Sequence, residues 1–280
     1  MKLLELIRDL AKERRARVAV GVGWERSSYV ESALCSALKA REQNFGEVVL
    51  VSGRGVVKDS YGIKLVESDE PWLTLLELLK SGEVDAAVRG TLSASKVLKT
   101  VKQLYGLEKL HRIALLETAD GRPFFFAPVG IDEGDTVKDK FTLIEHAVKL
   151  HKLLGLKPKI AILSGGRLED FGRSLQVDRM LCEGEFLASM VKREGVAEEV
   201  KHYGILIEDA IADEATFILA PDGVSGNLIF RTLEFLGGGR GIAAVYTDLL
   251  PTVLLDVSRA MKDFSEAIAL ASALVELSQK

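Results

Sequence analysis

The side chains best suited to chemistry gather in one stretch of the chain, from Pro221 to Asp263. Near its end, Ser258 and Arg259 follow an apolar run and precede the predicted last helix. A planar guanidinium suits a phosphate group, and a serine hydroxyl can stabilise an oxyanion. Asp263 could complement the dipole of that helix or act as a general base. We therefore predict Ser258, Arg259 and Asp263 as the catalytic part of an anion site.

The same stretch opens with a glycine-rich segment that runs from Asp222 to Asn227. Such a turn exposes backbone N–H groups at a helix N-terminus, where phosphate or carboxylate binds well. Asn227 is predicted at the start of the helix, and its amide either caps that helix or holds a ligand. Asp222, Gly226 and Asn227 are therefore candidate ligand-binding residues.

Two earlier turns of the same kind each follow a predicted strand. One is Arg89-Gly90-Thr91, and the other begins with Ser164-Gly165. Both favour an anion in the same way. The alternative is structural, because a tight turn between a strand and a helix needs glycine in any case. Arg89, Gly90, Thr91, Ser164 and Gly165 complete the set of candidate ligand-binding residues.

Several well-known motifs are missing from the sequence. Gly21 and Gly23 begin a dinucleotide fingerprint, but Arg26 stands where its third glycine should be. No Gly-Lys-Ser/Thr phosphate loop and no GxSxG elbow occur. Only two cysteines occur, Cys35 and Cys182, which excludes a disulfide framework and predicts a reducing compartment. The cysteines and the four histidines show no zinc-ligand spacing, so we expect no metal.

The composition is that of a globular protein with a sizeable core. Of the 280 residues, 48% are hydrophobic and 28% are charged, and the net charge is −4. This balance argues against nucleic acid or an anionic membrane as the main partner. The first 17 residues lack the continuous apolar segment of a signal peptide, and later apolar runs are too short to span a bilayer. We expect a cytoplasmic protein.

Strands and helices alternate along the chain, which predicts an α/β fold with mainly parallel sheets and helices on both faces. The predicted strands are Arg17–Gly23, Glu47–Ser52, Val84–Val88, Ile113–Glu117, Pro123–Val129, Lys159–Ser164, Ala215–Ala220 and Ile242–Tyr246. The predicted helices are Ser28–Gln43, Pro71–Leu79, Ser93–Tyr105, Asp139–Leu154, Gln176–Arg193, one after Asn227 and one from about Asp263.

A change of pattern after His111 predicts a second lobe. Asp120-Gly121 is a hairpin turn between two apolar runs, so an antiparallel pair is expected there. We predict two three-layer αβα lobes, residues 1–112 with 250–280 and residues 113–249, with a ligand cleft between them. The apolar face of the last helix could pack in a core or in a homodimer. Its residues are Ile268, Leu270, Leu274 and Leu277.

Four groups of residues resemble the phosphate acetyltransferase/butyryltransferase superfamily. Pro221-Asp222 with Gly226-Asn227, and Asp256-Val257-Ser258-Arg259, resemble its C-terminal motifs. Val84–Gly90 and Lys159–Ser164 resemble two of its strands. Within it, the chain is most similar to the archaeal methanogenesis marker protein 4 group, also called methyltransferase-related subunit X. The resemblance implies a phosphotransacetylase-like fold, related to that of isocitrate and isopropylmalate dehydrogenases.

The resemblance also implies an activity, the transfer of an acyl group between phosphate and a thiol. Ser258 and Arg259 would stabilise developing charge, and Asp263 would assist the thiol of coenzyme A. Coenzyme A or acyl-CoA would be a co-substrate rather than a tightly bound cofactor, beside a small phosphate- or carboxylate-bearing ligand. Ala260 and Arg231 stand where the superfamily has Gly and Lys.

Two other functions stay open. The group's name implies a methyl-transfer role in archaeal one-carbon metabolism or methanogenesis, together with methyltransferase-system subunits. The sequence carries no clear S-adenosylmethionine loop, corrinoid motif or zinc set for that role. The substitutions around the motifs are also compatible with a non-catalytic protein that binds a ligand on the same fold.

Overall fold

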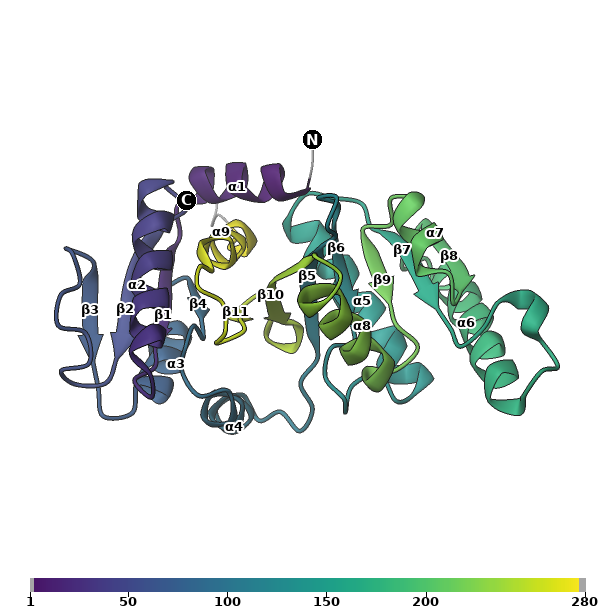
Figure 1. Ribbon diagram of the computed structural model, residues 1–280, viewed down its shortest axis with the longest axis horizontal. Coiled ribbons are helices and arrows are strands. Elements are labelled where there is room, and N and C mark those ends of the chain that lie inside the picture. The colour runs from purple at the N-terminus through teal and green to yellow at the C-terminus, as the bar shows by residue number, and fades with distance from the viewer. Residues whose placement is uncertain (1–2, 277–280) are drawn as a thin grey trace. The chain divides into compact units, whose positions relative to one another are not determined.

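The chain forms two compact units in a computed structural model that describes residues 3–276. Unit 1 comprises the described residues up to Leu110 and from Ile242 onward, and unit 2 comprises His111–Gly241. In Figure 1, unit 1 carries the colours of both ends of the chain, and unit 2 carries the teal and green of its middle. Each unit is built on its own group of strands.

The sheet of unit 1 is mostly parallel. Its strands are β1 (Arg17–Val22), β2 (Glu47–Ser52), β3 (Lys64–Glu67), β4 (Ala86–Val88), β10 (Arg240–Tyr246) and β11 (Val253–Asp256). They lie in the order β3-β2-β1-β4-β11-β10, and only the β11–β10 pair is antiparallel. Five of the six residues of β1 are buried, as expected for a strand covered on both faces.

Helices cover both faces of this sheet. They are α1 (Leu3–Arg14), α2 (Ser27–Glu42), α3 (Pro71–Ser81), α4 (Ala94–Tyr105) and α9 (Ser265–Leu274), with a 3₁₀ turn at Thr247–Leu249. Helices α3 and α4 pack their apolar side chains on one face, and α2 and α9 cover the other (Figure 1). Pro71 occupies the first turn of α3, where its missing N–H has no helical partner to lose.

The last helix, α9, lies in the core of unit 1. Ile268, Leu270 and Leu274 are fully buried there. The hydroxyl of Ser272 accepts the N–H of Ala16 at 3.0 Å, which joins α9 to the start of β1. The apolar face predicted for this helix therefore packs in the core, and its Leu277 lies outside the described residues.

The strands of unit 2 lie in the order β5-β6-β9-β7-β8. The strands are β5 (Arg112–Glu117), β6 (Pro123–Ala127), β7 (Lys159–Leu163), β8 (Glu199–Gly204) and β9 (Phe217–Leu219). The helices are α5 (Val137–Leu153), α6 (Leu175–Arg193), α7 (Ile207–Ala212) and α8 (Gly223–Phe235), with a 3₁₀ turn at Leu168–Asp170. Thr136 and Ser174 cap α5 and α6 through their side-chain oxygens, as small hydroxyl residues commonly do.

The predicted α/β architecture is confirmed, including the antiparallel β5–β6 hairpin around Asp120-Gly121. Strands β3 and β8 and helix α7 are among the elements that the sequence patterns did not predict. In strand β8 the polar Lys201 and His202 separate the buried Val200 from the buried Tyr203, so the strand lacks a continuous apolar run. Helix α8 begins at Gly223 and not after Asn227, because Asp222 accepts the N–H of Ser225 as its N-cap. Among residues 3–276, no helix is long and apolar enough to cross a membrane.

Burial in unit 2 leads to a stability prediction. Leu143 in α5 is 0% exposed, whereas Leu236, just after α8, is 84% exposed. We expect Leu143→Ala to lower the free energy of unfolding by about 2–5 kcal/mol, because it leaves a cavity. Leu236→Ala should change it by less than about 0.5 kcal/mol. Urea unfolding followed by circular dichroism measures both, and equal losses would contradict the buried position of α5.

Candidate functional site

The turns that follow β1, β4 and β11 come together at one edge of the unit 1 sheet. These three strands are parallel neighbours, so their carboxyl ends meet there. The edge carries Gly23 after β1, Arg89-Gly90-Thr91 after β4, and Ser258-Arg259 after β11. Ligands of parallel α/β sheets commonly bind at this edge.

Arg89 is buried at the end of β4, with 3% of its surface exposed. Its Nε donates to Asp256 Oδ1 at 2.5 Å and its Nη1 to the carbonyl of Leu92 at 2.5 Å. Nη2 donates to the carbonyl of Val257. Asp256 also accepts the Tyr246 hydroxyl at 3.2 Å. These contacts give Arg89 a clear positioning role, since they fix the residue directly before Ser258; binding of a ligand by Arg89 stays a prediction.

Gly90 and Thr91 join the turn after β4 to β1. Gly90 has a φ of +58°, and a Cβ there would lie 2.2 Å from the carbonyl oxygen of Gly21. Thr91 donates its N–H to Gly21 at 3.0 Å, and its hydroxyl accepts the N–H of Gly23 at 2.9 Å. The same hydroxyl donates to the carbonyl of Tyr29 at 3.1 Å. Glycine is thus required at position 90 by both its backbone angle and its close neighbour.

Arg259 is the partly exposed cation of this edge. Its guanidinium lies 5.3 Å from the ring centroid of Tyr29, and its Nη1 lies 3.5 Å from Glu25 Oε1. The guanidinium of Arg26 lies 5.8 Å from the same ring. The Ser258 hydroxyl accepts the N–H of Ala260 at 3.3 Å. The ring of Tyr29 therefore holds two arginines at the start of α2.

The first turn of α2 adds partial positive charge to these two arginines. Arg26 is the N-cap residue of α2 and, within the described part of the chain, its side chain makes no capping hydrogen bond. A helix start of this kind attracts an anion through its backbone N–H groups and its dipole. Arg26 and Arg259 would add two guanidinium groups suited to phosphate oxygens.

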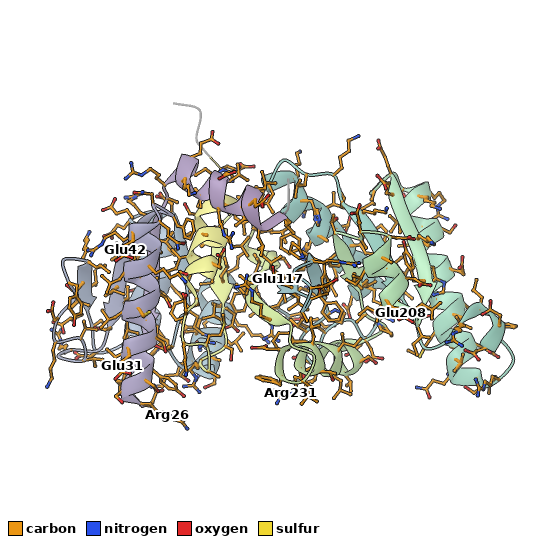
Figure 2. All side chains as sticks on the ribbon, turned by 45° about the horizontal axis from the view of Figure 1, so that its top comes forward. Arg26, Glu31, Glu42, Glu117, Glu208 and Arg231 are labelled. Atoms are coloured by element: carbon orange, nitrogen blue, oxygen red, sulfur yellow. The ribbon has the colours of Figure 1, made fainter. Side chains whose placement is uncertain are left out.

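Asp263 makes its contacts at the other end of α2. Its Oδ2 accepts from Lys39 Nζ at 2.5 Å, and its Oδ1 accepts the N–H of Ser265 at 2.9 Å. Tyr29 and Lys39 are ten residues apart in one helix, which is about 15 Å along its axis. Figure 2 shows Arg26 and Glu42 at the opposite ends of this helix. The contacts of Asp263 thus lead away from those of Arg259.

The environment of Asp263 also bears on its predicted role as a base. Partial burial would raise the pKa of the Asp263 carboxyl, but the hydrogen bonds from Lys39 and Ser265 outweigh this effect and lower the pKa. A lowered pKa makes the carboxylate a weaker base. The base role of Asp263 stays a prediction; its carboxylate accepts the N–H of Ser265, the first residue of α9.

In unit 2, the predicted ligand residues near Asn227 hold a neighbouring loop. Asn227 Nδ2 donates to the carbonyl of Val129 at 2.8 Å. A Cβ on Gly226 would lie 2.0 Å from the carbonyl oxygen of Pro128, so only glycine allows this approach. Asp222 accepts both the N–H and the hydroxyl of Ser225, at 2.7 and 3.1 Å. These contacts are structural, and ligand binding by the three residues stays a prediction.

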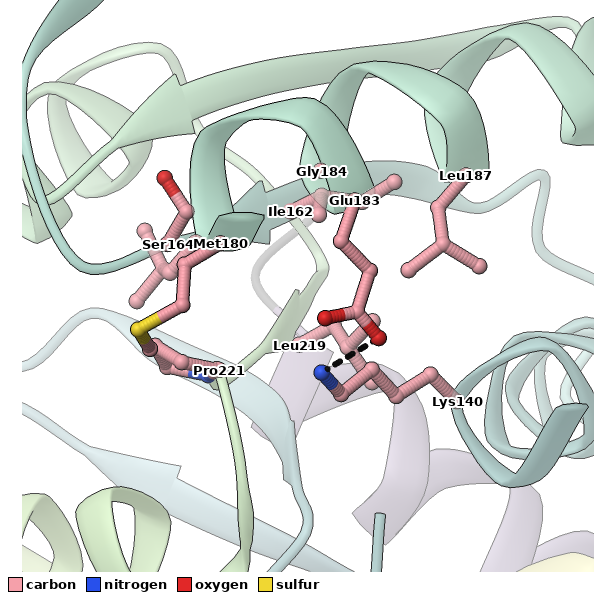
Figure 3. Close-up of a pocket in the computed structure, with 10 residues that line it drawn as sticks. Lys140, Ile162, Ser164, Met180, Glu183, Gly184, Leu187, Leu219 and Pro221 are labelled. Carbon is pink, nitrogen blue, oxygen red and sulfur yellow. Dashed lines mark hydrogen bonds and ion pairs between the residues drawn. The ribbon is translucent and has the colours of Figure 1, made fainter. Parts of the chain in front are cut away.

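Ser164 and its turn border a pocket in unit 2. The pocket residues lie in α5, β7, α6 and β9 and directly after β7 and β9 (Figure 3). Ser164 and Met180 lie at one side, and the ion pair between Lys140 and Glu183, at 3.0 Å, lies at another. Gly165 follows Ser164 directly, and a Cβ there would lie 2.6 Å from the sulfur of Met180.

Two residues beside Ser164 were missed by the sequence reasoning. His202 lies 2.8 Å from the Ser164 hydroxyl, and Glu185 lies 2.9 Å from the other ring nitrogen of His202. Ser164 directly follows β7, Glu185 lies in α6 and His202 lies in β8, so the three residues are far apart in the chain and form no local motif. A correct prediction of β8 would have placed His202 on the strand next to Ser164.

The ion pair of Asp263 gives a prediction on pH. We expect Lys39→Met to lower the free energy of unfolding at pH 7 by up to about 1 kcal/mol, as for other partly exposed pairs. The folded-state pKa of Asp263 is lowered, so the pair contributes above the unfolded pKa of about 4 and its contribution is lost as the pH falls further.

Denaturant unfolding of the wild type and of Lys39→Met from pH 7 to pH 3 measures the difference between their free energies of unfolding. This difference in free energy should become smaller below about pH 4. Lys58→Met, a change at an exposed lysine, is the control and should show no such narrowing. A difference for Lys39→Met that is independent of pH would contradict the pairing.

Comparisons with known proteins identify relatives of the chain. It is 46% identical, over 99% of its length and 97% of the relative, to the "Putative methyltransferase mtx subunit X" of Methanosarcina mazei. It is 23% identical to the phosphate acetyltransferase of Thermotoga maritima, over 64% of this chain and 66% of that one. No family model matches the chain.

Solved structures give the same fold. The branched-chain phosphotransacylase from Enterococcus faecalis V583 superposes with a TM-score of 0.72 at 18% identity, and the match covers 93% of this chain and 99% of that one. The resemblance that the sequence motifs indicated is thereby confirmed. The chain belongs to the Mtx subunit X family, a group within the phosphate acetyltransferase/butyryltransferase superfamily.

Proposed function

We propose that this chain is a transferase of the phosphotransacetylase type, which moves an acyl group between phosphate and a thiol such as coenzyme A. The observation that carries the proposal is the position of Arg259. Its guanidinium lies over Tyr29, at the same helix start as Arg26. The phosphotransacylase fold and the phosphate acetyltransferase relative support the same reaction class.

The proposed roles follow from the charge that develops during acyl transfer. When phosphate attacks a thioester, its oxygen bonds to the carbonyl carbon, the C–S bond breaks, and the thiolate takes up a proton. Arg259 would bind the phosphate oxygens, and the Ser258 hydroxyl would donate to the carbonyl oxygen as it becomes negative. Arg89 would keep both residues in place through its hydrogen bond to Val257.

Removal of the Arg259 guanidinium tests the proposal. We expect wild-type protein to release free thiol from acetyl-CoA or butyryl-CoA only when inorganic phosphate is present. Arg259→Ala should lower this rate by about 100-fold or more, as for loss of a group that stabilises transition-state charge. A colorimetric thiol assay measures the release. Arg193→Ala is the control, because Arg193 is exposed and pairs only with its neighbour Glu194 in the contacts described.

Failure to release thiol from either acyl-CoA would end the proposal as an enzymatic one. Calorimetric titration with coenzyme A and with phosphate then separates two cases. Binding that Arg259→Ala abolishes, without turnover in the wild type, would favour a non-catalytic protein that binds the same ligands. No binding of either would leave the anion site without support.

A second candidate rests on the name of the Methanosarcina mazei relative, a methyltransferase subunit. In this case the chain would act in methyl transfer together with other subunits. Co-purification of a corrinoid protein or a methyltransferase subunit with the tagged full chain would favour it. A lone protein with phosphate-dependent thiol release would argue for the first candidate.

A further inference from the structure

Ser164, His202 and Glu185 form a continuous line of hydrogen bonds within unit 2. Ser164 Oγ lies 2.8 Å from His202 Nε2, and His202 Nδ1 lies 2.9 Å from Glu185 Oε1. Both distances are those of good hydrogen bonds. The serine and the imidazole are buried, each with 2% exposure, whereas the Glu185 side chain is 59% exposed.

The chemistry of the three groups fixes the direction of these bonds. An ionised carboxylate can only accept, so the hydrogen on the imidazole must sit on Nδ1 and point to Glu185. The neutral ring then has an unprotonated Nε2, which accepts the hydroxyl hydrogen of Ser164. This is the arrangement in which a base draws the proton from a serine nucleophile while an acid orients the base.

The fold is shaped to bring these groups together. Strands β7 and β8 are parallel neighbours, so the ends that carry Ser164 and His202 lie on the same edge. Helix α6 crosses over them, with Gly184 directly before Glu185. A Cβ on Gly184 would lie 2.5 Å from His202 Nε2, so glycine leaves the room that the ring occupies.

The serine also borders a small pocket. Ser164 and Gly184 both line the unit 2 pocket (Figure 3). Met180, Leu187 and Leu219 give this pocket an apolar wall. The only ion pair along its lining, within the described residues, joins Lys140 and Glu183.

We propose that Ser164 is an acyl-accepting nucleophile, with His202 as its general base and Glu185 as the residue that positions His202. Ser164 Oγ attacks the carbonyl carbon of an ester or thioester, and its proton passes to His202 Nε2. The C–O or C–S bond then breaks, and His202 returns the proton to the leaving alcohol or thiol. Water then attacks the acyl-serine ester in the same way, which releases the acid and restores the Ser164 hydroxyl. This activity goes beyond the proposed function, since it needs neither phosphate nor Arg259.

A fluorophosphonate probe, applied to the full chain without phosphate or coenzyme A, tests the proposal. The probe should add once per chain, and mass spectrometry of the peptides should place it on Ser164. Ser164→Ala should abolish the addition. His202→Gln, which keeps a polar side chain in the same space, should slow it by about 100-fold or more.

Glu185 needs a test that separates positioning from folding. Glu185→Gln should slow the addition, and Glu185→Asp, which keeps the carboxylate, should recover part of the loss. Glu194→Gln, a change at an exposed carboxylate one residue past the end of α6, is the matched control and should react like the wild type. Circular dichroism of each variant confirms that it is folded.

Three results would overturn the proposal. They are no addition to the wild type, addition at a residue other than Ser164, and an unchanged rate in folded His202→Gln. Because the assay contains no phosphate or thiol, it is independent of the thiol-release test. Either result can therefore fail without deciding the other.

Discussion

The ion pair between Arg89 and Asp256 is the interaction on which the carboxyl edge of the unit 1 sheet depends. Burying a guanidinium costs several kcal/mol unless its charge and its N–H groups are matched. Asp256 supplies the charge, and the carbonyls of Leu92 and Val257 take two further N–H groups. Strands from the two ends of the unit 1 sequence, β4 and β11, are thereby fixed together. Arg259 lies two residues after Val257, whose carbonyl is held by Arg89.

Both candidate sites are built on glycines at which a backbone or ring comes unusually close. Gly90 allows the turn after β4 to approach β1, and Gly184 allows an imidazole to lie against α6. Glycine loses more conformational entropy on folding than other residues, but in each case it allows a close contact that a Cβ would block. The two sites differ in their electrostatics. The site at the start of α2 has two arginines at a partly exposed edge. The hydrogen-bonded line in unit 2 runs from the exposed carboxylate of Glu185 to the buried hydroxyl of Ser164.

The sequence was sufficient for the fold and for the residues at the strand ends, but not for their partners. Alternation of apolar strands and amphipathic helices is a local signal, and it predicted most elements to within a few residues. The partner of Arg89 is Asp256, and that of Ser164 is His202; both pairs join segments far apart in the chain. The hydrophobic periodicity of a segment does not indicate which distant residue its side chains will contact. Asn227 shows the local limit as well, since it follows the true N-cap, Asp222, by more than one turn.

The division of unit 1 between the two ends of the chain has a consequence for synthesis. Unit 2 is a continuous segment and is complete once Gly241 has been added. Unit 1 at that moment lacks β11 and α9, and therefore the carboxylate that neutralises Arg89 and the helix that fills much of its core. On the ribosome, where earlier segments generally fold first, the order is reversed here. Unit 1 begins first and can be completed only last, and until then its strands lack the cover that α9 provides.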